Sequence, residues 1–130
     1  MDRSALRELP AVGFAALLLV VSLLPAPETG GPTPAPLGIA LDKWVHAGSY
    51  GVLAFLLSWG RGSRTVAATA VLAALAVGYG VGIELLQTLV PSRSLSVADV
   101  LANAVGAVLG ALAWAAVTAP SARAVWRSEQ

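Results

Sequence analysis

The sequence contains no cysteine and few charged residues. Without cysteine there is no disulfide framework and no thiolate site, so the sequence does not indicate a redox compartment. Charged residues make up 12% of the chain and apolar residues 57%, whereas soluble domains carry roughly 25% charged and about 45–50% apolar residues. This composition indicates a protein that is surrounded by lipid.

A cluster of basic residues is also missing. Eight lysines and arginines stand against seven acidic residues, and they are scattered singly instead of forming the stripe that nucleic-acid-binding proteins show. We therefore expect no nucleic-acid partner. A length of 130 residues is typical of one domain, so we expect residues 1–130 to form a single transmembrane unit.

Four apolar runs have about the length that a membrane-crossing helix needs, which is about 20 residues within a range of about 17–25. Lipid cannot satisfy unpaired backbone groups, and the runs show no apolar–polar alternation, so they predict α-helices and exclude barrel strands. The expected fold class is all-α, an integral membrane bundle of four transmembrane helices. The expected spans cover residues 9–24, 44–59, 65–90 and 97–118.

Proline and glycine mark the connections between these spans. Residues 25–36 hold five prolines and two glycines, which cannot continue a helix, so residues 25–41 are expected to form an exposed loop. The segment 60–64 predicts a tight hairpin. Ser96 is the expected N-cap of the last span.

The distribution of arginine and lysine predicts the orientation in the membrane, because positively charged loops stay in the cytoplasm. One face of the bundle carries six of these residues, which are Arg3, Arg7, Arg61, Arg64, Arg123 and Arg127, and the other face carries Lys43 and Arg93. We expect both termini in the cytoplasm (N-in/C-in) and the loop 25–41 outside. Pro25 and Pro27 crowd any signal-peptide cleavage point, which favours a retained N-terminal anchor.

The remaining polar residues gather at the outer end of the expected bundle. Residues three or four apart share one face of a helix, so the second, third and fourth spans each present a polar stripe at a similar depth. The residues concerned are Asp42, Lys43, His46, Tyr50, Glu84, Gln87, Arg93, Ser96, Asp99 and Asn103. We expect the three stripes to face each other in one layer.

Two glycine pairs predict that helices approach closely, because small residues four apart let helix backbones pack against each other. Gly78 and Gly82 form such a pair on the third span, and Gly106 and Gly110 form another on the fourth. We expect both faces to pack against neighbouring helices.

The order and spacing of these residues resemble the VanZ-like family of small bacterial membrane proteins. The motifs are Asp42-Lys43-x-x-His46-x-x-x-Tyr50, Glu84-x-x-Gln87, Arg93 and Ser96-x-x-Asp99-x-x-x-Asn103-x-x-Gly106-x-x-x-Gly110. The resemblance covers about half of the chain, residues 42–110. It implies a multi-pass protein of the bacterial cytoplasmic membrane, and the founding member of the family is linked to teicoplanin resistance.

Each polar residue has an ordinary structural explanation as well as a functional one. Charged side chains at helix ends reach toward lipid headgroups, and buried amides join neighbouring helices. Ionisable residues inside a membrane nevertheless mark functional sites by default, and these residues lie at one end. We expect them to bind an outer-leaflet lipid or amphiphile through Lys43, His46, Tyr50, Glu84, Gln87, Arg93, Asp99 and Asn103.

Two other functions remain open. One is a membrane-embedded acid/base enzyme acting on a lipid-linked or cell-wall substrate, in which His46 is the general acid or base, Asp42 or Asp99 orients it, and Glu84 holds a proton. The other is a small proton-coupled transporter, for which oligomerisation could supply the missing lumen. We expect no cofactor and no metal site, because one histidine with dispersed carboxylates and no HExxH spacing is weak evidence for metal ligands.

Overall fold

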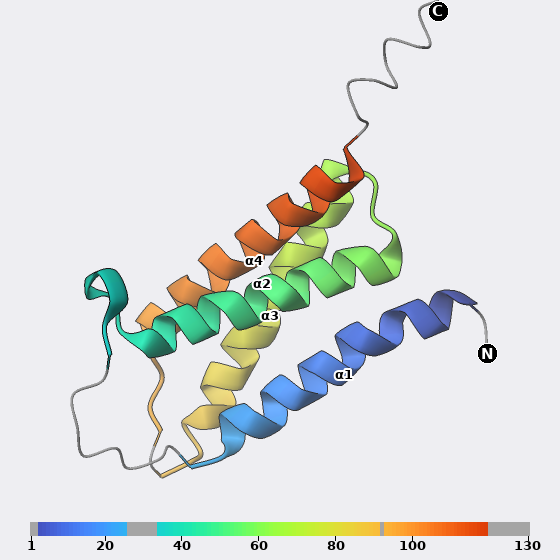
Figure 1. Cartoon of the computed structure of the whole chain (residues 1–130). Helices are drawn as coiled ribbons and strands as arrows, with labels where there is room; N and C mark the ends of the chain where they lie inside the picture. Colours follow the sequence, from blue (N-terminus) through green and yellow to red (C-terminus); the bar gives the residue numbers. More distant parts are fainter. Residues whose placement is uncertain (1–2, 26–33, 92, 120–130) are drawn as a thin grey trace, which may run out of the picture.

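The computed structural model describes residues 3–25, 34–91 and 93–119, and these residues form helices joined by short connections (Figure 1). The α-helices are α1 (Arg3–Leu23), α2 (Leu41–Arg61), α3 (Val66–Gln87) and α4 (Val97–Thr118), and a short 3-10 helix, η1 (Pro36–Gly38), precedes α2. The described part of the chain contains no strand. The expected all-α fold class is confirmed.

Consecutive helices run in opposite directions, so helix ends gather at two ends of the bundle (Figure 1). At one end, called here the polar end, α1 and α3 finish and α2 and α4 begin. At the other, called the hairpin end, α2 turns into α3, and Trp114 of α4 donates a hydrogen bond from Nε1 to the backbone oxygen of Ser63 at 2.8 Å. This bond ties α4 to the turn between α2 and α3.

In the part of the chain that the structure describes, three helices are long and apolar enough to cross a membrane: Ser4–Leu23 within α1, and the whole of α3 and α4. The helix α2 has 21 residues and is not among them. Its sequence is less apolar because Asp42, Lys43, His46 and Ser49 fall within its first half. The length of α2 therefore suits a membrane span, whereas its composition falls short of one.

The bundle exposes many large apolar side chains and buries several polar ones. Val12, Val71 and Leu112 are each 59–63% exposed, whereas Glu84 and Asn103 are each 1% exposed. A water-soluble bundle has the opposite arrangement, because apolar burial is its main driving force. Lipid as the surrounding medium accounts for both features.

The helix boundaries follow the local sequence. The α2 helix ends where Gly62 adopts a left-handed conformation with φ of 59°, which glycine tolerates without steric cost. The α3 helix ends at Gln87, short of the expected residue 90, because the residue before Pro91 is disfavoured in a helix. The expected cap of α4 is confirmed, since the backbone nitrogen of Asp99 donates to Ser96 Oγ at 3.2 Å.

The expected exposed loop 25–41 is described only in part, since residues 26–33 lie outside the described residues. Its second half contains η1, in which Leu37 has a φ of 56°. The indole nitrogen of Trp44 donates to the backbone oxygen of Pro36 at 3.3 Å. This bond fixes the end of the loop to the first turn of α2.

The α2 and α4 backbones approach each other at glycines. A β-carbon added to Gly106 would lie 2.6 Å from the carbonyl carbon of Ala47, and one added to Gly110 would lie 2.7 Å from that of Gly51. The close approach expected of Gly106 and Gly110 is confirmed. A small residue on the facing helix, Gly51, completes the contact.

The expectation for Gly78 and Gly82 is wrong, because an added β-carbon at either would meet nothing within 4 Å. The close contact on α3 is made by Gly80, whose added β-carbon would lie 2.8 Å from Asn103 Nδ2 and from Tyr50 Cε1. Gly78 and Gly82 flank that residue and point to other faces of α3, since successive helix positions are rotated by about 100°.

Candidate functional site

The tight packing of α2 on α4 brings two pairs of polar side chains together at the polar end. His46 Nδ1 lies 2.9 Å from Asn103 Oδ1, and Lys43 Nζ donates to Asp99 Oδ1 at 2.5 Å. Asn103 lies one turn before Gly106 on α4, and Asp99 lies one turn before Asn103. The glycine contact therefore sets the depth at which both pairs meet.

Lys43 also joins Asp42 to this group, because Nζ donates to Asp42 Oδ2 at 2.6 Å. The two residues precede the expected span 44–59. The hydrogen bond from Lys43 lowers the pKa of Asp42. Burial lowers the pKa of Lys43, but its hydrogen bonds to Asp42 and Asp99 outweigh that effect and raise the pKa overall. Lys43 therefore stays charged between its two carboxylate partners.

Glu84 reaches the same group from α3. Its Oε2 accepts a hydrogen bond from the backbone nitrogen of Ser96 at 3.1 Å, which is one of the free amide groups at the start of α4. Its Oε1 is buried and has no hydrogen-bond partner among the described residues. Glu84 thus joins α3 to α4 and leaves one carboxylate oxygen unsatisfied.

His46, Glu84 and Asp99 lie close enough to act on one ligand. Each of the three offers a ligand atom, and these atoms all lie within 4.8 Å of one another. His46 Nε2 lies 3.8 Å from Asp99 Oδ1. Imidazole and carboxylate groups bind divalent metals, so the three residues, called here the His46 cluster, could hold a metal ion. The expectation of no metal site rested on the single histidine and the missing HExxH spacing, and it did not weigh the approach of Glu84 and Asp99 to His46.

Gln87 and Arg93 face α1 instead of the His46 cluster. Gln87 Nε2 donates to the backbone oxygen of Ser22 at 2.9 Å, and an Arg93 nitrogen donates to that of Leu24 at 3.0 Å. The last carbonyl groups of a helix have no partner within it, so both side chains satisfy the end of α1. No motif in α1 predicts these contacts, so they could not be expected from the sequence.

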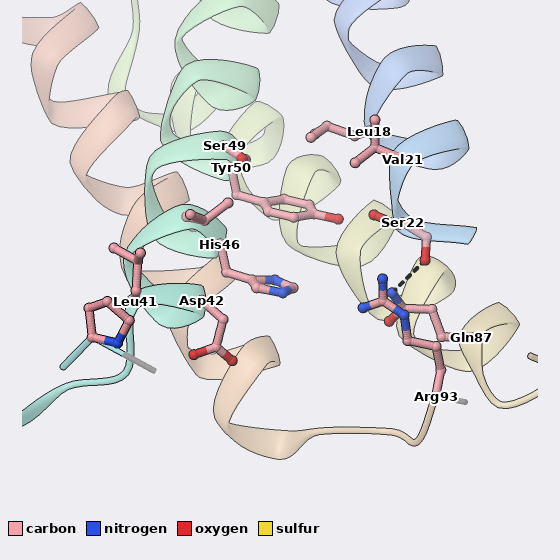
Figure 2. A pocket seen from close by; sticks show the side chains of 12 residues that line it. Leu18, Val21, Ser22, Leu41, Asp42, His46, Ser49, Tyr50, Gln87 and Arg93 are labelled. Atoms are coloured by element: carbon pink, nitrogen blue, oxygen red, sulfur yellow. Dashed lines mark hydrogen bonds between the residues drawn. The ribbon is translucent and has the colours of Figure 1, made fainter. Parts of the chain in front are cut away.

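Tyr50 lies below His46 on α2 and is 4% exposed. Its ring packs against Gly80 and belongs to a buried cluster with Leu53 and Ala54. Figure 2 shows the ring extending from α2 into the gap beside α1. Tyr50 therefore forms the floor between the polar end and the buried interior.

A pocket of about 430 Å³ opens between α1 and α2 at the polar end. Figure 2 shows Asp42, His46 and Tyr50 on one side of it and Gln87 and Arg93 on the other. Its lining residues are Leu18, Val21, Ser22, Pro34, Leu41, Asp42, Val45, His46, Ser49, Tyr50, Gln87 and Arg93. We call this space the α1–α2 pocket.

The structure thus divides the expected site into two adjoining parts. Asp42, His46, Tyr50, Gln87 and Arg93 line the α1–α2 pocket. The other four residues, Lys43, Glu84, Asp99 and Asn103, are absent from its lining and lie around His46 where α2, α3 and α4 meet. His46 belongs to both parts.

The chain is similar to a known protein family. A family model described as VanZ/LLP1 matches residues 9–118, a range that includes most of α1 and all of α2, α3 and α4. Searches of curated proteins and of solved structures find no match.

Proposed function

Since the chain belongs to the VanZ/LLP1 family, we propose that it is a membrane protein of the bacterial envelope that binds a lipid or amphiphile in the α1–α2 pocket. The observation that carries this proposal is the division of the pocket wall. Leu18, Val21 and Val45 supply apolar surface, whereas Asp42 and Arg93 supply charge. An amphiphile has the same division between its chain and its headgroup.

The charged groups of the pocket favour a headgroup that bears an anion. Arg93 has a buried Nε atom without a hydrogen-bond partner among the described residues, and arginine binds phosphate and carboxylate groups through several N–H donors. Asp42 lies across the pocket (Figure 2) and is 56% exposed in its side chain. It could accept a hydrogen bond from an amine on the same headgroup.

The proposal includes four membrane spans, with both termini in the cytoplasm and the polar end in the outer leaflet. The excess of arginine at the hairpin end and the termini supports this orientation. The buried side chains of Tyr50 and Ser58 support α2 as a span, because they direct its polar groups into the bundle. Reporter fusions at Gly62 and at the C-terminus test the orientation, and an outside location for either would contradict it.

A test of ligand binding uses native mass spectrometry of the full chain released from membrane patches. We expect a lipid-sized adduct on the unaltered protein and a lower occupancy in Arg93→Gln. The matched control is Arg61→Gln, because Arg61 lies at the hairpin end and pairs there with Glu8 at 3.0 Å. Bare protein throughout, or equal occupancy in the two variants, would refute binding in this pocket.

The resemblance to the VanZ-like family also links the proposal to glycopeptide antibiotics. We propose that occupation of the pocket changes the response of the cell to teicoplanin. Expression of the chain in a susceptible bacterium should raise the teicoplanin concentration that stops growth, and Arg93→Gln should reduce that effect. An unchanged inhibitory concentration would remove the resistance role and leave the binding proposal to its own test.

A second candidate function is acid/base catalysis on a lipid-linked or cell-wall substrate. The observation that favours it is the position of His46, which contacts Asn103 on one side and lies near Asp99 and Glu84 on the other. Such surroundings suit a general acid or base. The variant His46→Gln separates the two functions, since a binding protein should keep part of its activity and an acid/base enzyme should lose it.

A further inference from the structure

We propose that His46, Glu84 and Asp99 form a binding site for one divalent metal ion, Zn²⁺ or Mn²⁺, next to the α1–α2 pocket. Their ligand atoms lie within 4.8 Å of one another. In the tetrahedral geometry of zinc, ligand atoms at about 2.0–2.2 Å from the ion are separated from one another by about 3.3–3.6 Å. The widest separation among the three atoms must therefore shorten by up to about 1.5 Å to bring them onto one ion.

The unsatisfied oxygen of Glu84 is a second observation, independent of the spacing. Glu84 is 1% exposed, and its Oε1 has no hydrogen-bond partner among the described residues. A buried polar atom without a partner is costly, and each such atom in a native structure calls for a missing partner such as a water or an ion. A metal ion bound by this carboxylate would supply one.

The contact between His46 and Asn103 orients the histidine ring and fixes its tautomer for metal binding. Because Asn103 Oδ1 faces His46 Nδ1 at 2.9 Å, a neutral ring carries its proton on Nδ1 and keeps a lone pair on Nε2. That Nε2 is the atom that faces Asp99. Metal-binding histidines commonly donate their other N–H to such an outer partner. Asn103 is thus a positioning residue.

The donor types indicate which ions fit. One imidazole with two carboxylates is a ligand set that zinc accepts, and a metal site with three protein ligands leaves a position open. Manganese also accepts carboxylates, and imidazole binds transition metals in general. Calcium and magnesium prefer sites made only of oxygen, which this cluster is not.

Lys43 competes with the metal ion for Asp99. Its Nζ lies 2.5 Å from Asp99 Oδ1 and 2.6 Å from Asp42 Oδ2. When a metal ion binds Asp99, the ammonium group can remain on Asp42. We therefore expect Lys43→Met to bind the metal more tightly than the unaltered chain, because the competing charge is gone.

The first experiment needs no substitution, because the chain has a single histidine. Mn²⁺ is titrated into the purified, metal-stripped full chain in detergent after removal of any affinity tag, and free Mn²⁺ is measured by electron paramagnetic resonance. We expect one ion per chain, with electron spin echo modulation from an imidazole nitrogen. Absence of saturable binding, or bound Mn²⁺ without that nitrogen signal, overturns the proposal.

Substitutions then identify the carboxylates. We expect Glu84→Gln and Asp99→Asn each to weaken Mn²⁺ binding by at least about tenfold, since loss of even an outer partner costs about 10–100-fold. The matched control is Glu8→Gln, the same change at a carboxylate of the hairpin end. If Glu84→Gln elutes as the folded protein and still binds like the unaltered chain, Glu84 is not a ligand and the site is wrong.

A bound ion would also affect the proposed binding of an amphiphile. This last step of the inference rests on that proposed function. Among the described residues, the polar end carries three carboxylates, Asp42, Glu84 and Asp99, against two cations, Lys43 and Arg93. A divalent ion reverses that excess of negative charge and makes the neighbouring pocket favourable for a phosphate group. Metal binding is measured without a lipid. A chain that binds Mn²⁺ but carries no lipid would therefore refute the proposed function and leave the metal site in place.

Discussion

The contact between α2 and α4 makes Gly106→Ala the most informative single substitution. The new methyl carbon would lie 2.6 Å from the carbonyl carbon of Ala47, whereas non-bonded carbon atoms prefer about 3.5–4.0 Å. The helices must therefore separate by about 1 Å. Because the atoms that meet the methyl group belong to the backbone, no change of rotamer relieves the overlap. Overpacking of this kind costs about 1–3 kcal/mol, and occasionally more.

The matched control is Gly78→Ala, because a methyl group there meets nothing within 4 Å. It should change stability by no more than about 1 kcal/mol, in the stabilising direction, since alanine favours a helix over glycine by about that amount. The free energy of unfolding of both variants is measured by circular dichroism while SDS is titrated into mixed micelles. We expect Gly106→Ala to be less stable than Gly78→Ala by about 1–3 kcal/mol, because the gain in helix propensity is common to both variants and only the overlap differs. Equal stabilities would refute the close approach of the two backbones.

Three further predictions use the same unfolding assay. Trp114→Phe leaves the buried carbonyl of Ser63 without the indole N–H at 2.8 Å, and we expect a loss of about 1–3 kcal/mol. Tyr79→Phe removes the bond from Tyr79 to the backbone oxygen of Ala15 at 2.6 Å and should cost about 0.6–1.7 kcal/mol. Because hydrogen bonds raise the pKa of Lys43 above 10.5, the stability they add is full below pH 10.5 and is lost as the pH rises through the raised value. An alkaline titration should therefore destabilise the unaltered chain more than Lys43→Met, and identical pH profiles would contradict this reasoning.

The sequence predicts the helices best where turn chemistry marks their ends. The expected span 97–118 coincides with α4, because Ser96 supplies a side-chain cap. The expected span 44–59 is shorter than α2, which begins at Leu41 and ends at Arg61. An apolar run marks the part of a helix that faces lipid or the core. It does not mark the turns at either end, where Lys43 forms hydrogen bonds with its neighbours.

The error at Gly78 and Gly82 has a physical cause that the sequence could have shown. A glycine pair identifies two residues on one face of a helix but not the neighbour that this face meets. Counting back from Glu84 by four residues gives Gly80, and from Gln87 by four gives Ile83, and both are buried. The polar residues of α3 therefore point to the packed face, while Gly82 lies about 200° around the helix from Glu84.

The division of the site into the α1–α2 pocket and the His46 cluster could not be predicted, because this division depends on the position of α1. Residues three or four apart share a helix face, so Glu84 and Gln87 were expected to act together. The structure has α4 on one side of that face and α1 on the other, which directs Glu84 to Ser96 and Gln87 to Ser22. Free carbonyl groups at the end of α1 attract the amide of Gln87, and free amides at the start of α4 attract the carboxylate of Glu84. The chemistry of the two helix ends thus decides which side chains face the pocket. His46 belongs to both the α1–α2 pocket and the His46 cluster, so a change in the surroundings of His46 in one part should alter the other.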